Sequence, residues 1–242
     1  MAVNPIKAAI TDVILTFLWM CCASSLGIGT TIIAAALGIQ GSLTLVITTV
    51  LIAAVVFVFN FIGELLGGAS FNPTGTILFY AAGLGDDSLF SMALRFPAQA
   101  VGAVGGALAM KELMPIRYQH MLGGPALKVD AHTGAIAEGV LTFVISLAVL
   151  IIIFKVSGGP MIKTWLIAVA TVAMIIAGAN YTGPSMNPVN AFGWAYVNDW
   201  HNTWEQFYVY WICPFVGAVL AAWVFRFLFP QPKMQKAHVK KE

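Results

Sequence analysis

The stretches Ser-Phe-Asn-Pro-Thr-Gly at residues 70–75 and Gly-Pro-Ser-Met-Asn-Pro-Val-Asn-Ala-Phe-Gly at residues 183–193 share an Asn-Pro pair, and both lie within apolar sequence. Asn is a good helix N-cap and Pro fits the first helical position, so each pair predicts the start of a helix, at Asn72 and at Asn187. Helix ends expose unpaired backbone groups, which are tolerated at membrane depth only inside protein or beside water. Two such starts in corresponding parts of the chain indicate discontinuous helices that meet at a pore.

The composition places the chain in a membrane. Of its 242 residues, 60% are hydrophobic and 9% are charged, and the mean hydropathy is +0.87. A soluble domain normally carries about 25% charged residues. The net charge of +2 is too small to indicate a nucleic acid as a partner. The three cysteines lie in apolar runs, which favours packed small side chains over a disulfide framework.

Apolar runs predict six membrane spans, because a spanning helix needs about 20 apolar residues. Two shorter runs follow the Asn-Pro pairs and are too short to cross, so each predicts a half-helix that enters the membrane and returns. The first run is long enough to span, and we expect no cleavable signal peptide. The predicted spans are residues 8–32, 42–63, 88–113, 133–154, 161–179 and 204–229, and the predicted half-helices are 73–82 and 188–197.

The placement of Lys and Arg predicts that both termini are cytoplasmic. In that topology most basic residues face the cytoplasm and few lie in the loop between the third and fourth spans, as the positive-inside rule requires. The inside residues are Lys7, Arg95, Lys155, Lys163, Arg226, Lys233, Lys236, Lys240 and Lys241, and the outside residues are Lys111, Arg117 and Lys128.

An internal repeat relates the two halves. Asp-Val-Ile-Leu-Thr-Phe at 12–17 corresponds to Glu-Gly-Val-Leu-Thr-Phe at 138–143, and Val-Gly-Ala-Val at 101–104 returns at 216–219. With three spans in each copy, the second copy is inserted upside down, which brings the half-helices together near the membrane midplane. We therefore predict a single domain over residues 1–242, with repeats at about 8–113 and 133–229 and a cytoplasmic tail at 230–242.

Six spans, an inverted repeat and paired Asn-Pro motifs together resemble the aquaporins of the major intrinsic protein family, over residues 8 to 229. The Thr after the first Asn-Pro pair, the Thr-Gly-Pro-Ser-Met ahead of the second, the short first loop and the Lys-bearing tail resemble the plant small basic intrinsic proteins of the first type. The resemblance implies an all-α membrane protein, a right-handed bundle of six transmembrane helices with two re-entrant half-helices. It also implies a homotetramer with one pore in each subunit, in the lipid bilayer of the endoplasmic reticulum.

The resemblance further implies passive permeation of water, with small neutral solutes as additional candidate permeants. The amides of Asn72 and Asn187 would donate hydrogen bonds to the passing water oxygen. Each half-helix start carries roughly +0.5 of an elementary charge, which repels protons. The midplane residues are Asn72, Pro73, Thr74, Asn187, Pro188 and Val189.

The departures from the family pattern concern the midplane and the outer mouth. Thr74 and Val189 stand where the family usually has Ala, so the half-helices must pack differently. Asn190 stands where most relatives carry Arg, which replaces a charged planar donor group by a neutral amide. The mouth is therefore expected to be apolar and less selective than usual. Its positions, carried over by spacing, are Ile52, Ile175, Pro184 and Asn190.

Three carboxylates lie in or near apolar spans, where an unpaired charge is costly. Asp12 and Glu138 occupy equivalent repeat positions, and the resemblance implies that they accept hydrogen bonds from the loops that carry the Asn-Pro pairs. A proton relay is the alternative, but symmetric placement favours structural support. Glu64 has no counterpart in the second half, and we favour a position at the lipid headgroups over one in the cytoplasmic vestibule.

The sequence shows no Ser-His-acid set, no phosphate loop and no metal-ligand spacing, so we expect neither an enzyme nor a cofactor or metal site. The rival function is a weakly conducting or non-conducting membrane protein that keeps the aquaporin-like shell for assembly or structure. Lys240 and Lys241 lie one position closer to the C-terminus than in the usual dilysine retrieval signal. Retention in the endoplasmic reticulum is therefore expected to rest on other sequence.

Overall fold

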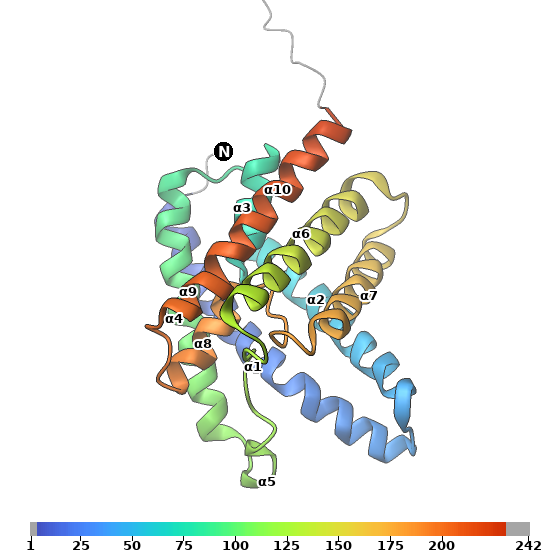
Figure 1. The fold of residues 1–242 in the computed structure, drawn as a ribbon. Coiled ribbons are helices and arrows are strands. Elements are labelled where there is room, and N and C mark those ends of the chain that lie inside the picture. The colour runs from blue at the N-terminus through green and yellow to red at the C-terminus, as the bar shows by residue number, and fades with distance from the viewer. Residues whose placement is uncertain (1–3, 231–242) are drawn as a thin grey trace, which may run out of the picture.

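The computed structural model describes residues 4–230, and every regular element in that range is helical (Figure 1). Residues 231–242 of the predicted tail, including Lys240 and Lys241, lie outside the described residues. A 3-10 turn (Gly41–Leu43) precedes α2, and a π-helical turn (Tyr208–Ile212) joins α9 to α10. The helices are α1 (Pro5–Leu37), α2 (Thr44–Leu65), α3 (Pro73–Ala82), α4 (Leu89–Leu113), α5 (Ile116–Gln119), α6 (Ala131–Lys155), α7 (Pro160–Gly178), α8 (Pro188–Val197), α9 (Trp204–Phe207) and α10 (Cys213–Leu228).

The prediction of an all-α membrane protein is confirmed. Within residues 4–230, five helical segments are long and apolar enough to cross a membrane. They comprise α1, α2, α6, α7 and the continuous segment Trp204–Leu228. The remaining predicted span, residues 88–113, is helix α4. It has 25 residues and therefore the length, but it is less apolar because it contains Arg95 and Gln99. Both of these side chains are buried, so α4 turns its polar groups toward protein.

The first helix is longer than the predicted span 8–32. It begins one residue after Asn4, whose side-chain oxygen accepts hydrogen bonds from the backbone of Ile6 and Lys7, and it runs to Leu37. Gly38 then adopts a left-handed conformation with φ 66°, which glycine tolerates at a helix end. The glycines inside the helix do not end it, whereas the left-handed Gly38 does.

The two halves of the chain pack in matching ways. Helix α1 packs along α4, as α6 packs along α10. The half-helix α3 lies against α10, and the half-helix α8 lies against α4, so each half-helix is held by the last long helix of the other half. The described chain begins and ends at the same end of the bundle, with α5 at the opposite end (Figure 1).

Glycines let the paired long helices approach closely. A Cβ atom added to Gly102 of α4 would collide with the carbonyl oxygen of Val13 on α1. In the second half, a Cβ atom added to Gly217 of α10 would collide with the carbonyl oxygen of Gly139 on α6. Small residues at such contacts allow backbone-to-backbone packing in a membrane, where apolar burial drives association weakly.

We expect Gly102→Ala to lower the thermal unfolding midpoint in detergent, because the added methyl group forces α1 and α4 apart. Gly27→Ala in α1 is the matched control, since a Cβ atom added there would have no other atom within 4 Å. Ala is a better helix former than Gly by about 1 kcal/mol, so the control is expected to be neutral or slightly stabilising. Equal midpoints for the two variants would contradict the close contact.

The last long segment is not a regular α-helix throughout. Pro214 has no backbone N–H, and its ring would clash with the carbonyl four residues earlier, at Tyr210. The chain widens into the π-helical turn Tyr208–Ile212 just before this proline. The turn buries Tyr210 almost completely and brings its hydroxyl within 3.2 Å of the Thr182 carbonyl oxygen, to which it donates.

Candidate functional site

The half-helices α3 and α8 begin at Asn72 and Asn187, as the Asn-Pro pairs predict. Both asparagines have extended backbone conformations, and each side-chain oxygen accepts a hydrogen bond from the backbone N–H two residues later. The distances are 2.9 Å from Thr74 N to Asn72 Oδ1 and 3.2 Å from Val189 N to Asn187 Oδ1. The side-chain oxygens are therefore used as helix caps, and the amide nitrogens face outward from the helix starts.

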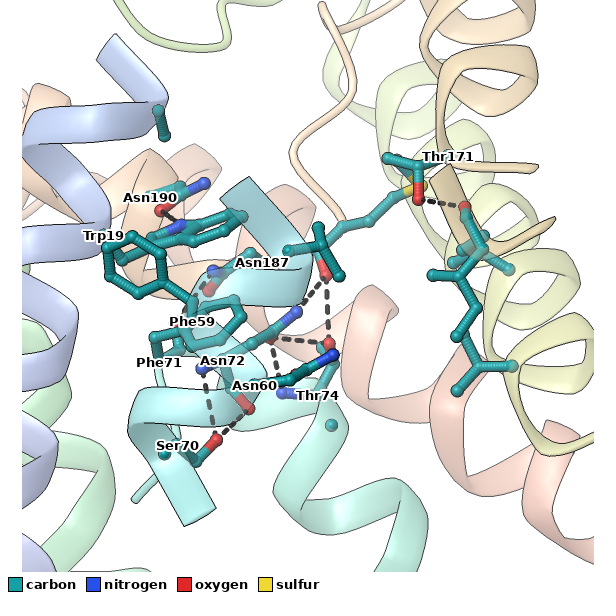
Figure 2. Close-up of a pocket in the computed structure, with 18 of the residues that line it drawn as sticks. Trp19, Phe59, Asn60, Ser70, Phe71, Asn72, Thr74, Thr171, Asn187 and Asn190 are labelled. Carbon is teal, nitrogen blue, oxygen red and sulfur yellow. Dashed lines mark hydrogen bonds between the residues drawn. The ribbon is translucent and has the colours of Figure 1, made fainter. Parts of the chain in front are cut away.

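The two amide nitrogens bind reciprocally across the junction of the half-helices. Asn72 Nδ2 donates to the carbonyl oxygen of Met186 at 3.2 Å, and Asn187 Nδ2 donates to the carbonyl oxygen of Phe71 at 3.0 Å. Each bond reaches the residue just before the other asparagine (Figure 2). A primary amide carries two N–H donors, so each asparagine keeps one donor for a molecule in the cavity.

The residues that replace the usual alanines behave differently from each other. Thr74 Oγ1 lies 2.7 Å from Asn72 Oδ1 and 2.9 Å from the Met186 carbonyl oxygen, and its single proton can serve either acceptor. This hydroxyl adds a polar link between the two halves. Val189 is fully buried and brings no polar atom. The midplane is thus chemically asymmetric, although the helix starts are alike.

Asp12 supports the segment before α3 from a buried position on α1. Its Oδ1 accepts the backbone N–H of Ser70 at 2.7 Å, and Gln99 Nε2 donates to its Oδ2 at 2.7 Å. Arg95 neutralises it through two hydrogen bonds, Nε to Oδ2 at 2.8 Å and Nη2 to Oδ1 at 2.9 Å. Arg95 also donates to Asp87 and to the carbonyl oxygen of Gly68, which ties both flanks of α3 to α4.

Glu138 supports the segment before α8, and no cation among residues 4–230 forms an ion pair with it. It accepts the backbone N–H groups of Ser185 at 2.8 Å and Met186 at 3.1 Å, and the hydroxyl of Thr182 donates to it at 2.8 Å. Met186 has a φ of 51°, which is costly for a residue with a side chain, and the bond to Glu138 helps to hold it there. Tyr210 stands at the repeat position that corresponds to Arg95. The segment before α3 is therefore supported by a carboxylate paired with an arginine, and the segment before α8 by a carboxylate that accepts hydrogen bonds from neutral groups.

A single cavity of about 1200 Å³ runs past both half-helix starts. It is lined by Asn72, Thr74 and Asn187, while Pro73, Pro188 and Val189 are buried behind them. All four predicted mouth residues line the same cavity. Ile52 packs mainly against α7, with 6% of its surface exposed, whereas Ile175 is 38% exposed. The lining residues that the sequence analysis placed at the mouth are Ile52, Ile175, Pro184 and Asn190.

The cavity lining also includes charged residues, among them Glu64. For this residue, the sequence favoured a position at the lipid headgroups. Glu64 lines the cavity together with Asp87, Arg95 and Lys163, which favours the vestibule position over the headgroup position that the sequence analysis preferred. The turn after α2 directs this segment back toward α3, which the apolar run of the span does not reveal. Arg95, which the sequence analysis counted among the cytoplasmic basic residues, is buried and forms ion pairs with Asp12 and Asp87.

Sequence reasoning missed an aromatic wall of the cavity. Trp19 on α1 stacks on Phe71 with ring centroids 4.1 Å apart, and it forms a T-shaped pair with Phe59 with ring centroids 5.4 Å apart. Its indole nitrogen donates to Asn190 Oδ1 at 3.1 Å (Figure 2). Asn60 of α2 also lines this cavity. Nothing in the local sequence separates Trp19 from a lipid-facing tryptophan, because its partners lie far along the chain.

A channel-forming family is indicated by this combination of two opposed half-helices, a helical membrane bundle and a cavity along the helix starts. The model of the family described as "Major intrinsic protein" matches residues 2–225, and the chain belongs to this family. It is therefore a membrane channel of the aquaporin type and not an enzyme.

The similar proteins include plant aquaporins named SIP1, which confirms the resemblance to the small basic intrinsic proteins. The chain is 62% identical to "Aquaporin SIP1-2" of Zea mays, with 96% of this chain and 98% of that protein covered. It is 59% identical to "Aquaporin SIP1-1" of Oryza sativa subsp. japonica, with 98% and 100% covered. It is 51% identical to "Aquaporin SIP1-1" of Arabidopsis thaliana, with 98% of each covered.

Among solved structures, the fold is similar to that of the aquaglyceroporin from Plasmodium falciparum, with a TM-score of 0.67. The match covers 90% of this chain and 95% of that one at 18% sequence identity, so it shows the fold alone.

Proposed function

We propose that the chain forms a pore for the passive permeation of water, with small neutral solutes as further permeants. The observation that carries this proposal is the shared cavity, in which both Asn72 and Asn187 keep one free N–H donor beside the passage. A water molecule that accepts from these donors turns its own hydrogens away from the midplane. The relatives named as aquaporins support the same function.

Proton exclusion is part of the proposal. The half-helix dipoles of aquaporin-type pores are a known barrier to protons and cations, since each helix start is electropositive. Here α3 and α8 both begin beside the cavity, and the side-chain oxygens of their N-caps are turned inward to the helix. The groups that the two asparagines turn toward the midplane are therefore N–H donors, which disfavour a passing proton.

Osmotic shrinkage of proteoliposomes, followed by stopped-flow light scattering, tests the proposal. We expect wild-type vesicles to shrink faster than empty vesicles of the same lipid, without a faster collapse of an imposed pH gradient. Shrinkage equal to that of empty vesicles would instead favour the non-conducting structural role.

The mouth residue Asn190 gives a separate prediction. Asn190→Arg is expected to lower the permeability to solutes larger than water, because the longer charged side chain would narrow the proposed mouth. Its other proposed residues, Ile52, Ile175 and Pro184, line the same cavity. Proton exclusion should remain nearly unchanged, since it depends on the half-helix starts. Paired solute and proton flux in liposomes measures both, and an unchanged solute flux would show that position 190 does not limit passage.

Assembly and location are proposed from the resemblance. Each subunit of a homotetramer would hold its own pore in the endoplasmic reticulum membrane, with both termini in the cytoplasm. Crosslinking in mild detergent that traps only monomers or dimers would contradict the tetramer. A tagged protein found mainly at the cell surface would contradict the location, and a protease-protected C-terminus in intact microsomes would contradict the topology.

A further inference from the structure

Trp19 contacts both Asn-Pro segments from α1. Its ring stacks on Phe71, at the start of the first segment, with an angle of 21° between the ring planes. Its indole N–H donates to the side-chain oxygen of Asn190, which lies in the first turn of α8 within the second segment, at 3.1 Å. Phe59 forms a T-shaped pair with the same ring, with an angle of 82° between the ring planes. Because two aromatic rings hold the indole, the direction of its N–H bond is set by packing.

The indole fixes which end of the Asn190 amide faces the cavity. An indole nitrogen can only donate a hydrogen bond, so the atom of Asn190 that faces it must be the oxygen. If the Asn190 amide were rotated by 180°, its NH₂ group would face the indole N–H of Trp19, and the two donors would repel each other. Figure 2 shows the Asn190 nitrogen on the side away from Trp19. Asn190 lines the cavity, so what it offers there is the NH₂ group.

The three amides of the site then share one pattern. Asn72 and Asn187 use their oxygens to cap α3 and α8, and Asn190 uses its oxygen to accept from Trp19. Every one of these side-chain oxygens is engaged by protein, while the nitrogens lie toward the passage. At these three amides, a passing molecule with an acceptor oxygen finds partners, and an N–H donor of the passing molecule does not.

We propose that Trp19 is a specificity-determining positioning residue, which holds Asn190 as a donor and thereby disfavours donor-rich solutes relative to water. The inference rests on the proposed pore function. It assigns to a neutral Trp-Asn pair the donor role that an arginine would otherwise provide at the mouth.

The test compares urea and water permeability of reconstituted vesicles. Urea has four N–H donors and one acceptor, so it should be disfavoured by a wall that offers donors. Trp19→Phe keeps the stacking on Phe71 but removes the indole N–H, which frees the Asn190 amide to turn its oxygen inward. We expect the ratio of urea to water permeability to rise roughly 2- to 10-fold, the effect of about one hydrogen bond. Trp223→Phe on α10 is the matched control, because Trp223 is 58% exposed on the outside of the bundle, and its ratio should not change.

Two further variants separate amide orientation from pore width. In an Asn190→Leu background there is no amide to turn, so adding Trp19→Phe should not raise the ratio further. Asn190→Asp presents an oxygen to the cavity while a second oxygen still accepts from Trp19, so it should raise the ratio even if Trp19→Phe does not fold.

The outcomes distinguish the two proposals. An unchanged ratio in folded Trp19→Phe, an equal rise in the Asn190→Leu background, or no rise in Asn190→Asp would overturn the role of Trp19 and leave water permeation standing. Wild-type vesicles no more permeable to water than empty ones would overturn the pore function, and with it this inference.

Discussion

Replacing Asn187 by leucine is expected to reduce osmotic water permeability by roughly tenfold or more, close to that of empty vesicles. The leucine has a similar size but no donor for the passing water oxygen. It also leaves the Phe71 carbonyl oxygen without its partner at 3.0 Å. An unsatisfied polar group in such a place costs about 1–3 kcal/mol, which is enough for this loss. Asn72→Leu should act in the same way, because Asn72 holds the reciprocal bond to Met186. Stopped-flow shrinkage, corrected for the amount of reconstituted protein, measures the effect.

Lost capping is the competing explanation, since the leucine also removes the oxygen that accepts from Val189 N. Asn187→Ser separates the two effects. Serine caps helices well, but it lacks the amide group that donates hydrogen bonds, and its side chain is shorter. We expect this variant to unfold at a midpoint near that of the wild type and still to lose most of its permeability. Asn202→Leu, at an exposed turn, is the control for the substitution itself. Wild-type permeability in Asn187→Ser would show that the cap, not the donor, matters.

The largest effect on stability is expected from Arg95→Met, about 3–5 kcal/mol of destabilisation, because it leaves the buried Asp12 carboxylate without its cation. Arg95 is 3% exposed and Asp12 is fully buried, and two hydrogen bonds join them. The same guanidinium also binds Asp87 and Gly68, so its loss should loosen both flanks of α3. Thermal or denaturant unfolding in detergent gives the measurement.

Arg226→Met is the matched control for this prediction. Arg226 is exposed on α10 and makes one bond, to the Ala81 carbonyl oxygen at 3.2 Å, so its replacement should cost little. Adding Asp12→Asn to Arg95→Met should restore part of the lost stability, because the unpaired charge is removed while an oxygen remains for Ser70 N. If the two arginine variants were equally stable, the buried ion pair would not support the fold as described.

Local sequence was sufficient for the features that depend on neighbours in the chain. The half-helices occupy 73–82 and 188–197 as predicted, because Asn is a favoured helix cap and Pro a favoured first helical residue. The long helices follow from apolar runs of membrane length. The equivalence of Asp12 and Glu138 was visible in the repeat, since both precede the same Leu-Thr-Phe sequence.

Only the tertiary structure decided which side chains meet across the bundle. Trp19 and Asn190 are 171 residues apart, and Arg95 is 83 residues from Asp12, so no local pattern marks either pair. The link from Thr74 to Met186 and the position of Glu64 in the cavity likewise depend on how the loops return between the helices. The sequence by itself therefore determined the elements, their order and the two amides at the half-helix starts. The counter-ions, the aromatic wall and the orientation of the third amide come from packing, because they need partners that the chain brings together only when folded.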